Sequence, residues 1–371
     1  MKTYSHLYKQ VFSWRNLNDA YFKAGKHKNT SSVRRFSKNY VLELSLLKHE
    51  LCNKAYSPKR LEKFVLRDPK TRVICVSDFR DRVVHHALVN VLQPIFEPRF
   101  ICDSFASRKG KGTLAAVKRF DQFKRELTVN SRRSLTVACS DGREKDVIRG
   151  YVFKADIYHY FQSVDHEVLI RIIAKYVKDD DIIWLIRKIL ENYDSGVSSK
   201  GMPLGNWTSQ FFANVYLNEL DQFVKHVLRA KHYIRYVDDF VILHRSKRVL
   251  IGYESRIKDF LSSLKLRLHP NKCSIAPLHR GTQFLGFRIF DKHKLVRKRN
   301  IYKIRRRIYE LLECYGAGLV DADKVLNSLQ GWSAYAMHAN TYKLRRELRK
   351  EATAGLINRN PLRDAVRKRK P

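Results

Sequence analysis

The sequence predicts an α+β protein in which a ferredoxin-like sheet carries acidic residues and a basic helical module follows. Residues 151–245 show the order strand, helix, helix, strand pair, which suits a split βαβ sheet. Two adjacent carboxylates, Asp238 and Asp239, stand between apolar segments in "YIRYVDDFVIL". From residue 291 onward, 21 Lys+Arg stand against 8 Asp+Glu in a mostly helical pattern. These observations separate an acidic site from a basic tail.

The composition indicates a globular protein with a polyanionic partner. The chain has 371 residues, enough for two or three subdomains, and 44% hydrophobic residues. Its formal net charge of +38 puts nucleic acid first among partners, with an anionic membrane surface as the alternative. No apolar run could span a bilayer, and "MKTYSHLYKQVFSW" has no signal-peptide core. The six cysteines include no CxxC pair, which favours a cytoplasmic location over a zinc module or disulfide scaffold.

Hydrophobic periodicity predicts the elements before residue 150. Leucines at helical spacing predict a helix over 40–51, and β-branched residues predict two strands around the turn "DPKT". A helix then begins near residue 81 and is expected to stop at Pro94. A basic glycine-containing loop, "RKGKG", leads into another helix. Residues 127–149 are expected to form an exposed irregular connection.

The same reasoning predicts the elements from residue 151 onward. A strand leads to Asp156, two amphipathic helices follow, and the loop "GMPLGNWTSQ" ends in Thr208 and Ser209. Both residues are good N-caps for the helix 210–228. After the strand pair around Asp238 and Asp239, we expect a helix over 253–264 and a hairpin formed by "TQFLGFRIF" and "KLVRKR".

Three aspartates at strand ends are suited to metal chemistry. A split βαβ sheet places Asp156 at the end of one strand and Asp238 and Asp239 in the turn of a neighbouring hairpin. Mg²⁺ prefers oxygen ligands, and two ions ~3.5–4 Å apart can clamp an in-line phosphoryl displacement. The alternative is an ordinary hairpin turn, because Asp is a common turn residue. In a chain this basic, an acidic cluster needs a counter-charge, which bound metal would supply.

Several ordered motifs resemble those of reverse transcriptases. "RYVDDF" resembles their aromatic-x-Asp-Asp box, and "KADIYHYFQSVDH" resembles their first catalytic box. "GMPLGNWTSQFFANVYLNELD" resembles the next box, with Leu204 and Gly205 in place of Gln-Gly, and Ser209 and Gln210 in place of Ser-Pro. This variant resembles the reverse transcriptases of diversity-generating retroelements, which are related to group II intron and retron enzymes. The similarity extends to "DPKTRVICVSDFRDRVVHHAL", "SFASRKGKGTLAAV", "QFLGFRIF" and "LQGWSAYAMHANTYKL", and so covers most of the chain.

The resemblance implies a right-hand polymerase with fingers, a ferredoxin-like palm and a helical thumb. The expected domains are an N-terminal extension and fingers (1–150), a palm with part of the fingers inserted (151–290) and a basic thumb (291–371). The implied cofactor is a pair of Mg²⁺ ions, for which Mn²⁺ can substitute. The implied partners are dNTPs, a template RNA with its cDNA duplex, and a small helical accessory protein. The residues implied as catalytic or metal-binding are Asp156, Ile157, Asp238 and Asp239.

The resemblance also implies a nucleotide site. Phe161 occupies the sugar-gate position, where a ring would clash with a 2′-hydroxyl; the alternative is a core aromatic, since Tyr160 and Phe161 cannot point the same way on a strand. Lys70 and Arg72 could contact triphosphate oxygens, and Arg suits bidentate contact with phosphate. The alternative is that both belong to a solvated charged turn, and this alternative is stronger for Lys70 than for Arg72. Leu204 cannot make the hydrogen bonds of glutamine, which predicts misincorporation opposite template adenine. The implied nucleotide-binding residues are Lys70, Arg72, Phe161, Leu204, Gly205 and Gln210.

Two segments are expected to contact nucleic acid. Cations flanked by Gly110 and Gly112 could bind a phosphate backbone or form an ordinary flexible loop. "FLGFRIF" resembles a primer grip, in which Gly286 would admit the primer backbone, although Phe284 and Phe287 could simply be core. The implied nucleic-acid-binding residues are Arg108, Lys109, Lys111, Phe284, Leu285 and Gly286.

Three functions remain open from the sequence. The first is an error-prone reverse transcriptase that performs mutagenic retrohoming in a diversity-generating retroelement. The second is a reverse transcriptase of a defence or group II intron-like system; the lack of a Cys/His nuclease box in the sequence argues against the intron role. The third is a non-catalytic RNA-binding scaffold, against which the three aspartates argue.

Overall fold

A computed structural model describes residues 2–67, 71–129, 135–138, 144–147 and 150–359. The chain divides into two compact units whose segments alternate along the sequence. The first unit contains Met1–Ala116, Phe153–Ile242 and Arg248–Ser274, and the second contains Val117–Val152, Leu243–Lys247 and Ile275–Pro371. The described helices include none long and apolar enough to cross a membrane.

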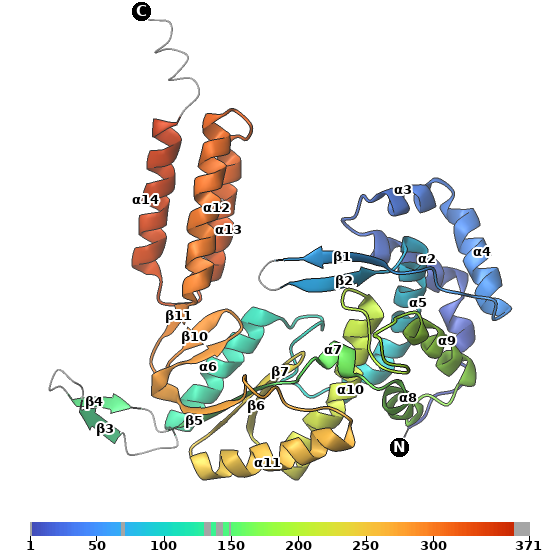
Figure 1. Cartoon of the computed structure of the whole chain (residues 1–371), viewed down its shortest axis with the longest axis horizontal. Coiled ribbons are helices and arrows are strands. Elements are labelled where there is room, and N and C mark those ends of the chain that lie inside the picture. Colours follow the sequence, from blue (N-terminus) through green and yellow to red (C-terminus); the bar gives the residue numbers. More distant parts are fainter. Residues whose placement is uncertain (1, 68–70, 130–134, 139–143, 148–149, 360–371) are drawn as a thin grey trace, which may run out of the picture. The chain divides into compact units, whose positions relative to one another are not determined.

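The first unit begins with helices and a strand pair, as predicted. Strands β1 and β2 pair antiparallel, with Glu62 opposite Val76 and Leu66 opposite Arg72. Figure 1 shows this hairpin in blue, beside the label of α2. The elements are α1 (Tyr8–Val11), α2 (Trp14–Gly25), α3 (Ser31–Lys38), α4 (Tyr40–Cys52), β1 (Glu62–Leu66), β2 (Arg72–Val76), α5 (Phe79–Phe96) and a 3₁₀ turn (Glu97–Arg99).

Helix α5 does not stop at Pro94, as the sequence predicted, but continues to Phe96. Proline removes one backbone donor, and this loss falls in the last turn, where it costs a single hydrogen bond. Ile95 and Phe96 are buried, and the Phe96 ring packs edge-on against Tyr176 and Phe211. Tertiary packing therefore holds the last turn in a helical conformation.

The remaining elements of the first unit include most of a four-stranded sheet with the strand order β6–β7–β5–β8, whose strand β8 has only Ser274 in this unit. This mixed arrangement confirms the α+β class. The elements are β5 (Tyr151–Asp156), α7 (Tyr160–Ser163), α8 (His166–Ala174), α9 (Asp180–Glu191), α10 (Trp207–Gln222), a π-helical turn (Phe223–Val227), β6 (His232–Tyr236), β7 (Asp239–His244), α11 (Lys247–Ser263) and β8 (Ser274–Pro277).

Two helix starts differ from the predictions. Helix α10 begins at Trp207 after Asn206, whose backbone is extended, so Thr208 and Ser209 lie buried in the first turn rather than at the cap. Helix α11 begins at Lys247 rather than at residue 253. Its buried face begins at Leu250 and continues at helical spacing, and burying that leucine lengthens the helix.

The second unit contains α6, two small sheets and a helical bundle. The predicted hairpin after residue 281 is a three-stranded antiparallel sheet with the order β11–β10–β9. The connection 127–149 was expected to be irregular, and this was wrong. Leu135 pairs with Val147 in an antiparallel hairpin, since "LTVA" has high strand propensity. The elements are α6 (Thr113–Val129), β3 (Leu135–Ala138), β4 (Glu144–Val147), a 3₁₀ turn (Leu278–Arg280), β9 (Thr282–Phe284), β10 (Phe287–Ile289) and β11 (Lys294–Val296).

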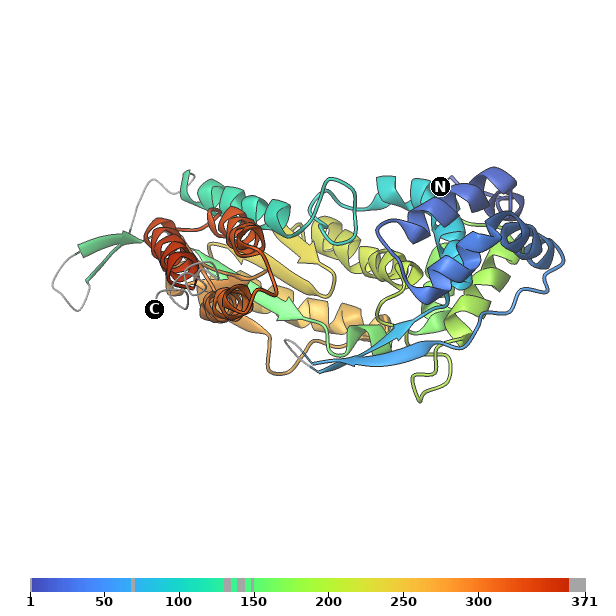
Figure 2. The ribbon, with the colours of Figure 1, turned by 90° about the horizontal axis from the view of Figure 1, so that it is seen from above.

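The predicted basic helical module is a bundle of α12 (Lys298–Gly316), α13 (Ala322–Ala336) and α14 (Tyr342–Asn358). Figure 1 shows these helices side by side, and Figure 2 shows them end-on. One face of each helix is apolar, and these faces meet in a shared core while most of the cations lie on the other faces. The core residues are Ile304, Ile308, Leu311, Leu312, Val325, Leu329, Leu348 and Ala352.

Candidate active site

A cleft of about 680 Å³ in the first unit gathers most of the residues predicted to bind nucleotide and metal. They come from β2, the end of β5, α7, the loop before α10, the first turn of α10 and the turn between β6 and β7. Segments that are distant in the sequence thus contribute to one site. The predicted residues that line it are Arg72, Asp156, Ile157, Phe161, Leu204, Gly205, Gln210 and Asp238.

Two carboxylates share one wall of the cleft. Asp156 is the last residue of β5, and Asp238 lies in the turn that joins β6 to β7. Strand β5 is the neighbour of β7 in the sheet, and the Ile157 N–H donates to the Asp238 carbonyl oxygen at 3.2 Å. The sequence predicted that Asp156 and Asp238 lie on neighbouring strand ends. The turn is also strained, because Val237, a β-branched residue, has a φ of 55°.

The acidic side chains at this wall repel one another. Burial raises the pKa of Asp238, and the charge of Asp156 adds to the effect, while Lys272 and Arg72 oppose it. Burial raises the pKa of Asp239 to about 6; Lys154 opposes this rise, and the charges of Asp156 and Asp238 add to it. A bound cation would relieve this repulsion.

Asp239 lies beside the cleft rather than in its lining. Asp239 is the first residue of β7, whereas Asp238 belongs to the preceding turn. Its Oδ1 lies 3.6 Å from the Lys154 Nζ on β5. That oxygen is buried and has no hydrogen-bond partner. The predicted set of three carboxylates is thus divided between the cleft and the contact with Lys154.

Lys272 occupies a position that would compete with a metal ion. Its Nζ lies 2.8 Å from the Asp156 Oδ1, and the His269 N–H donates to the Asp156 carbonyl oxygen at 2.7 Å. Both Lys272 and His269 line the cleft. Sequence reasoning missed them, because one lysine among 74 Lys+Arg carries no distinguishing signal.

The donor chemistry of the cleft fits Mg²⁺. In the described part of the chain, no three His, Cys, Asp or Glu side chains are grouped closely enough to hold an ion as they stand. Mg²⁺ requires only one or two protein carboxylates, because it keeps several waters and also takes phosphate oxygens from a substrate. Asp156 and Asp238 offer these carboxylates, and Ile157, the residue after Asp156, also lines the cleft. The Oδ1 of Asp239, which faces Lys154 at 3.6 Å, is a further oxygen next to the cleft.

Two adjacent aromatic residues point in different directions beside the carboxylates. Tyr160 is buried, and its hydroxyl donates to the Ala213 carbonyl oxygen at 2.8 Å. Phe161 is partly exposed, and both residues line the cleft. They lie on the short helix α7 rather than on a strand. Tyr160 is therefore the core aromatic, and Phe161 is the ring available to a substrate.

The loop before α10 forms another wall and is attached to β2. The Cys75 N–H donates to the Leu204 carbonyl oxygen at 3.1 Å. Gly205 has a φ of 126°, and a Cβ there would lie 3.0 Å from the Cys75 carbonyl oxygen. This close approach requires glycine. Nearby, the Ser107 hydroxyl donates to the Gln210 Oε1 at 2.9 Å, so Ser107 is another lining residue that the sequence did not indicate.

The structure gives Arg108 of the basic loop partners within the protein. The Arg108 side chain is 7% exposed; its Nε donates to Glu97 at 2.7 Å, and its Nη1 donates to the Ile101 and Ser104 carbonyl oxygens. Arg108 therefore stabilises the loop from inside, where it is not presented to phosphate. Lys111 donates to the Cys102 carbonyl oxygen, and Lys109 is exposed. Lys70 lies outside the described residues.

The residues expected to grip a primer belong to the second unit. Phe284 is buried against Phe120, so it is a core residue. Leu285 and Gly286 form the turn between β9 and β10, with φ values of 44° and 92°. A Cβ on Gly286 would lie 2.5 Å from the Tyr335 hydroxyl, which donates to the Gly286 carbonyl oxygen at 3.1 Å. The close approach that requires glycine here is thus made by Tyr335, which sequence reasoning missed.

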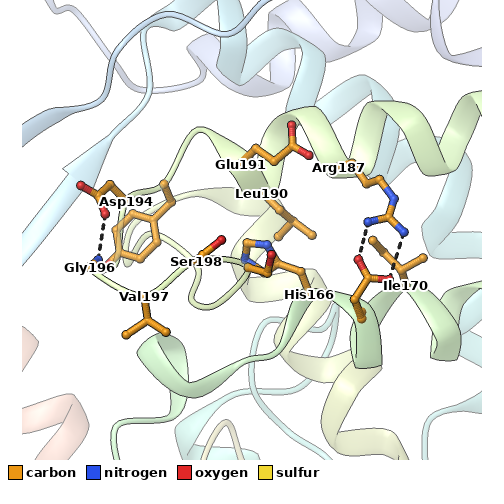
Figure 3. Close-up of a pocket in the computed structure, with 12 residues that line it drawn as sticks. His166, Ile170, Arg187, Leu190, Glu191, Asp194, Gly196, Val197 and Ser198 are labelled. Carbon is orange, nitrogen blue, oxygen red and sulfur yellow. Dashed lines mark hydrogen bonds and ion pairs between the residues drawn. The ribbon is translucent and has the colours of Figure 1, made fainter.

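A second cavity, of about 530 Å³, is formed by α8, α9 and the loop after α9 (Figure 3). Its lining includes none of the predicted site residues. Arg187 is paired with Glu167, and the His166 Nε2 lies 2.7 Å from the Gly201 carbonyl oxygen. Because these groups already have partners within the protein, we assign no chemistry to this cavity.

Comparisons with known proteins show what the chain is similar to. Residues 58–289 match the family described as reverse transcriptase (RNA-dependent DNA polymerase). The protein YkfC of Escherichia coli K12 is 26% identical over 302 residues, which cover 71% of this chain and 73% of YkfC. The group II intron-encoded protein LtrA of Lactococcus lactis subsp. cremoris is 30% identical over 160 residues, 42% of this chain and 23% of LtrA. A solved structure of apo telomerase from Candida tropicalis, 14% identical, covers 68% of this chain and 59% of that chain with a TM-score of 0.48.

Proposed function

The chain belongs to the reverse transcriptase family, and on this basis we propose that it copies a template RNA into cDNA by two-metal nucleotidyl transfer in the cleft of Asp156 and Asp238. One observation carries the proposal. The two carboxylates stand on one wall of a cleft whose other walls carry Arg72, Phe161 and Leu204. Acidic oxygens, a cation and a ring around one space suit a metal-bound nucleoside triphosphate.

Each side chain has a proposed role in this reaction. Asp156 and Asp238, with Ile157, hold two Mg²⁺ ions, for which Mn²⁺ can substitute, and Asp239 completes the acidic cluster. The ions supply charge neutralisation at the transferred phosphoryl group. Arg72 contacts the triphosphate, and Gly205 and Gln210 border the nucleotide. Phe161 excludes ribonucleotides by steric contact with the 2′-hydroxyl.

We propose the three-part domain division in the same terms: fingers over 1–150, palm over 151–290 and thumb over 291–371. The basic faces of α12–α14 suit the template–cDNA duplex, because phosphate contacts by Lys and Arg are independent of sequence. Lys109 and Lys111 are further candidates for phosphate contact, and Leu285 and Gly286 are candidates for primer contact through their partly exposed turn.

The biological role that we favour is the error-prone enzyme of a diversity-generating retroelement. Leu204 lines the cleft at a position where a glutamine side chain could hydrogen-bond, and leucine offers no such bond. In this role the partners are a structured RNA of the retroelement and a small helical accessory protein. A group II intron-like role is the second candidate, favoured by the 30% identity with LtrA. A non-catalytic RNA scaffold fits less well, because it has no use for mutually repelling carboxylates in a cleft.

Primer extension on RNA tests the proposed chemistry. The purified chain should extend a DNA primer on an RNA template in Mg²⁺ and dNTPs, and Asp238→Ala should abolish extension while RNA affinity stays within about twofold of wild type. Binding of RNA without extension, both in Mg²⁺ and in Mn²⁺ and with the cognate RNA, would instead support the scaffold role. Sequencing of the cDNA separates the remaining roles. Errors confined to template adenines support the retroelement enzyme, and the lack of such errors supports the group II intron-like role.

A further inference from the structure

A fully buried ion pair lies behind the turn that carries Asp238. The side chains of Arg235 on β6 and Asp221 on α10 are both 0% exposed. The Arg235 Nε donates to the Asp221 Oδ1 at 2.7 Å, and its Nη2 donates to the Asp221 Oδ2 at 2.6 Å. The Tyr233 hydroxyl also donates to the Asp221 Oδ1, at 2.7 Å. Such a bidentate pair fixes the plane and the position of the guanidinium group.

The remaining guanidinium nitrogen reaches the turn itself. The Arg235 Nη1 donates to the Val237 carbonyl oxygen at 3.1 Å. Val237 has a φ of 55°, a conformation that a β-branched residue adopts only when its surroundings impose it. The hydrogen bond from Arg235 to the Val237 carbonyl oxygen can hold Val237 in this conformation. The next residue is Asp238, so the same contact sets the direction in which this carboxylate enters the cleft.

The network also reaches two other walls of the cleft. The Arg235 Nη1 donates to the Asn214 Oδ1 at 3.2 Å, and the Asn214 Nδ2 donates to the Ala106 carbonyl oxygen at 2.9 Å. Both Asn214, from α10, and Ala106 line the cleft. The Arg235 backbone reaches the same segment, because its carbonyl oxygen accepts from the Phe105 N–H at 3.0 Å. One buried side chain thus connects the turn, α10 and the loop that contains Ala106.

We propose that Arg235, oriented by Asp221, is a positioning residue that fixes Asp238 relative to Asp156. The proposal rests on the proposed function for its effect on catalysis, but the structural effect does not depend on it. A buried ion pair is a poor source of stability, since apolar residues of similar volume often replace it without loss. Its value here is geometric: a fully satisfied polar network selects one arrangement of the turn.

The test separates positioning from stability. The double variant Arg235→Met with Asp221→Leu removes both buried charges together and so avoids leaving one unpaired. Arg235→Lys is the second variant: it keeps a charge for Asp221 but lacks the planar fork that reaches Val237. Asp81→Asn is the matched control. Asp81 is a buried carboxylate of the same unit that accepts from the Tyr56 hydroxyl at 2.9 Å and does not line the cleft.

Two readouts are measured on folded protein, below each variant's unfolding temperature. The first is amide hydrogen exchange in the peptide that contains the turn of Val237 and Asp238. The second is single-nucleotide extension on an RNA template, with kcat and the KM for dNTP determined separately. The double variant should lose protection in the turn and lose about 10²-fold in kcat, with KM within about threefold of wild type. Arg235→Lys should show the same direction of change, and Asp81→Asn should lose stability only.

The outcomes distinguish the inference from the proposed function. Unchanged turn protection in the double variant overturns the positioning role, as does a kcat within twofold of wild type despite lost protection. If the wild-type protein extends no primer under any of the conditions above, the proposed function fails, and hydrogen exchange alone then decides whether Arg235 holds the turn.

Discussion

The Lys272 Nζ lies 2.8 Å from the Asp156 Oδ1, so one of the two cleft carboxylates is already neutralised by a lysine. The Lys272 side chain is 38% exposed and approaches from the segment that follows α11. A metal ion that binds Asp156 must displace or share this contact. A metal ion at this carboxylate would therefore compete with Lys272 when substrate is not bound.

Removing this competitor should strengthen metal binding. Lys272→Met is expected to tighten Mn²⁺ binding to the substrate-free protein by about fivefold, because a partly exposed ion pair contributes ~1 kcal/mol or less. Electron paramagnetic resonance titration of Mn²⁺ measures this change. Lys265→Met is the matched control: Lys265 pairs with Asp165 at 2.7 Å away from the cleft lining, so its removal should leave Mn²⁺ affinity unchanged. Equal affinities in Lys272→Met and wild type would contradict the competition.

Asp239 should make the metal-free protein less stable as the pH rises. Its pKa is raised from 3.8 to about 6 in the folded state, so between these values the folded protein binds more protons than the unfolded one. The free energy of unfolding therefore falls at this site as the pH increases from about 4 to about 6. Asp239→Asn should remove this dependence and raise the free energy of unfolding at pH 7.5 by about 1–3 kcal/mol.

Urea unfolding in a chelator at pH 4.5 and pH 7.5 measures the effect of Asp239. The difference in stability between Asp239→Asn and wild type should be largest at the higher pH. A difference that is the same at both pH values would show that the Asp239 carboxylate carries no burial penalty.

Gly205 should be intolerant of a side chain. Gly205→Ala places a Cβ 3.0 Å from the Cys75 carbonyl oxygen at a φ of 126°, so we expect a loss of about 1–3 kcal/mol in stability and a higher KM for dNTP. Gly252→Ala is the control, because Gly252 lies in α11 with nothing within 4 Å of the added Cβ and should gain ~0.5–1 kcal/mol. Thermal unfolding and extension kinetics test both variants. An unchanged KM in Gly205→Ala would mean that this loop does not shape the nucleotide site.

Leu204 should influence fidelity opposite adenine. Leu204→Gln restores a side chain that can hydrogen-bond in the cleft, so we expect at least about a threefold lower error rate at template adenines, with errors at other bases unchanged. Sequencing of cDNA made by both proteins on one adenine-containing RNA measures the rates. Leu204→Met keeps an apolar side chain of similar volume and serves as the control. Equal error rates for wild type and Leu204→Gln would show that Leu204 does not determine fidelity opposite adenine.

The sequence predicted the parts of the site that depend on strand order. Asp156 and Asp238 could be placed together because both mark strand ends in a split βαβ pattern. The partners of these residues could not, because Lys272, Lys154 and Arg235 are ordinary members of a large set of cations whose positions are fixed only by tertiary packing. Their pairing with Asp156, Asp239 and Asp221 is visible only in the folded chain.

The same limit explains the errors in the predicted elements. Pro94 was judged by a local rule as a helix stop, and the partners of Arg108 could not be predicted from the sequence. Burial of the following residues keeps the helix intact beyond Pro94, and Glu97 together with two carbonyl oxygens holds Arg108 inside its loop. Packing overrides local propensity in the first case, and hydrogen bonding fixes the side chain in the second.

Single-nucleotide incorporation on an RNA template tests the central claim most directly. Wild-type protein is compared with Asp156→Asn and Asp238→Asn, which change the two carboxylates that line the cleft. The control is Glu254→Gln, which changes a partly exposed carboxylate on α11 that pairs with Lys258 outside the cleft. We expect incorporation by wild type and Glu254→Gln, and a loss of at least about 10³-fold in both cleft variants at unchanged RNA affinity. Incorporation by Asp156→Asn or Asp238→Asn within tenfold of wild type would contradict this claim.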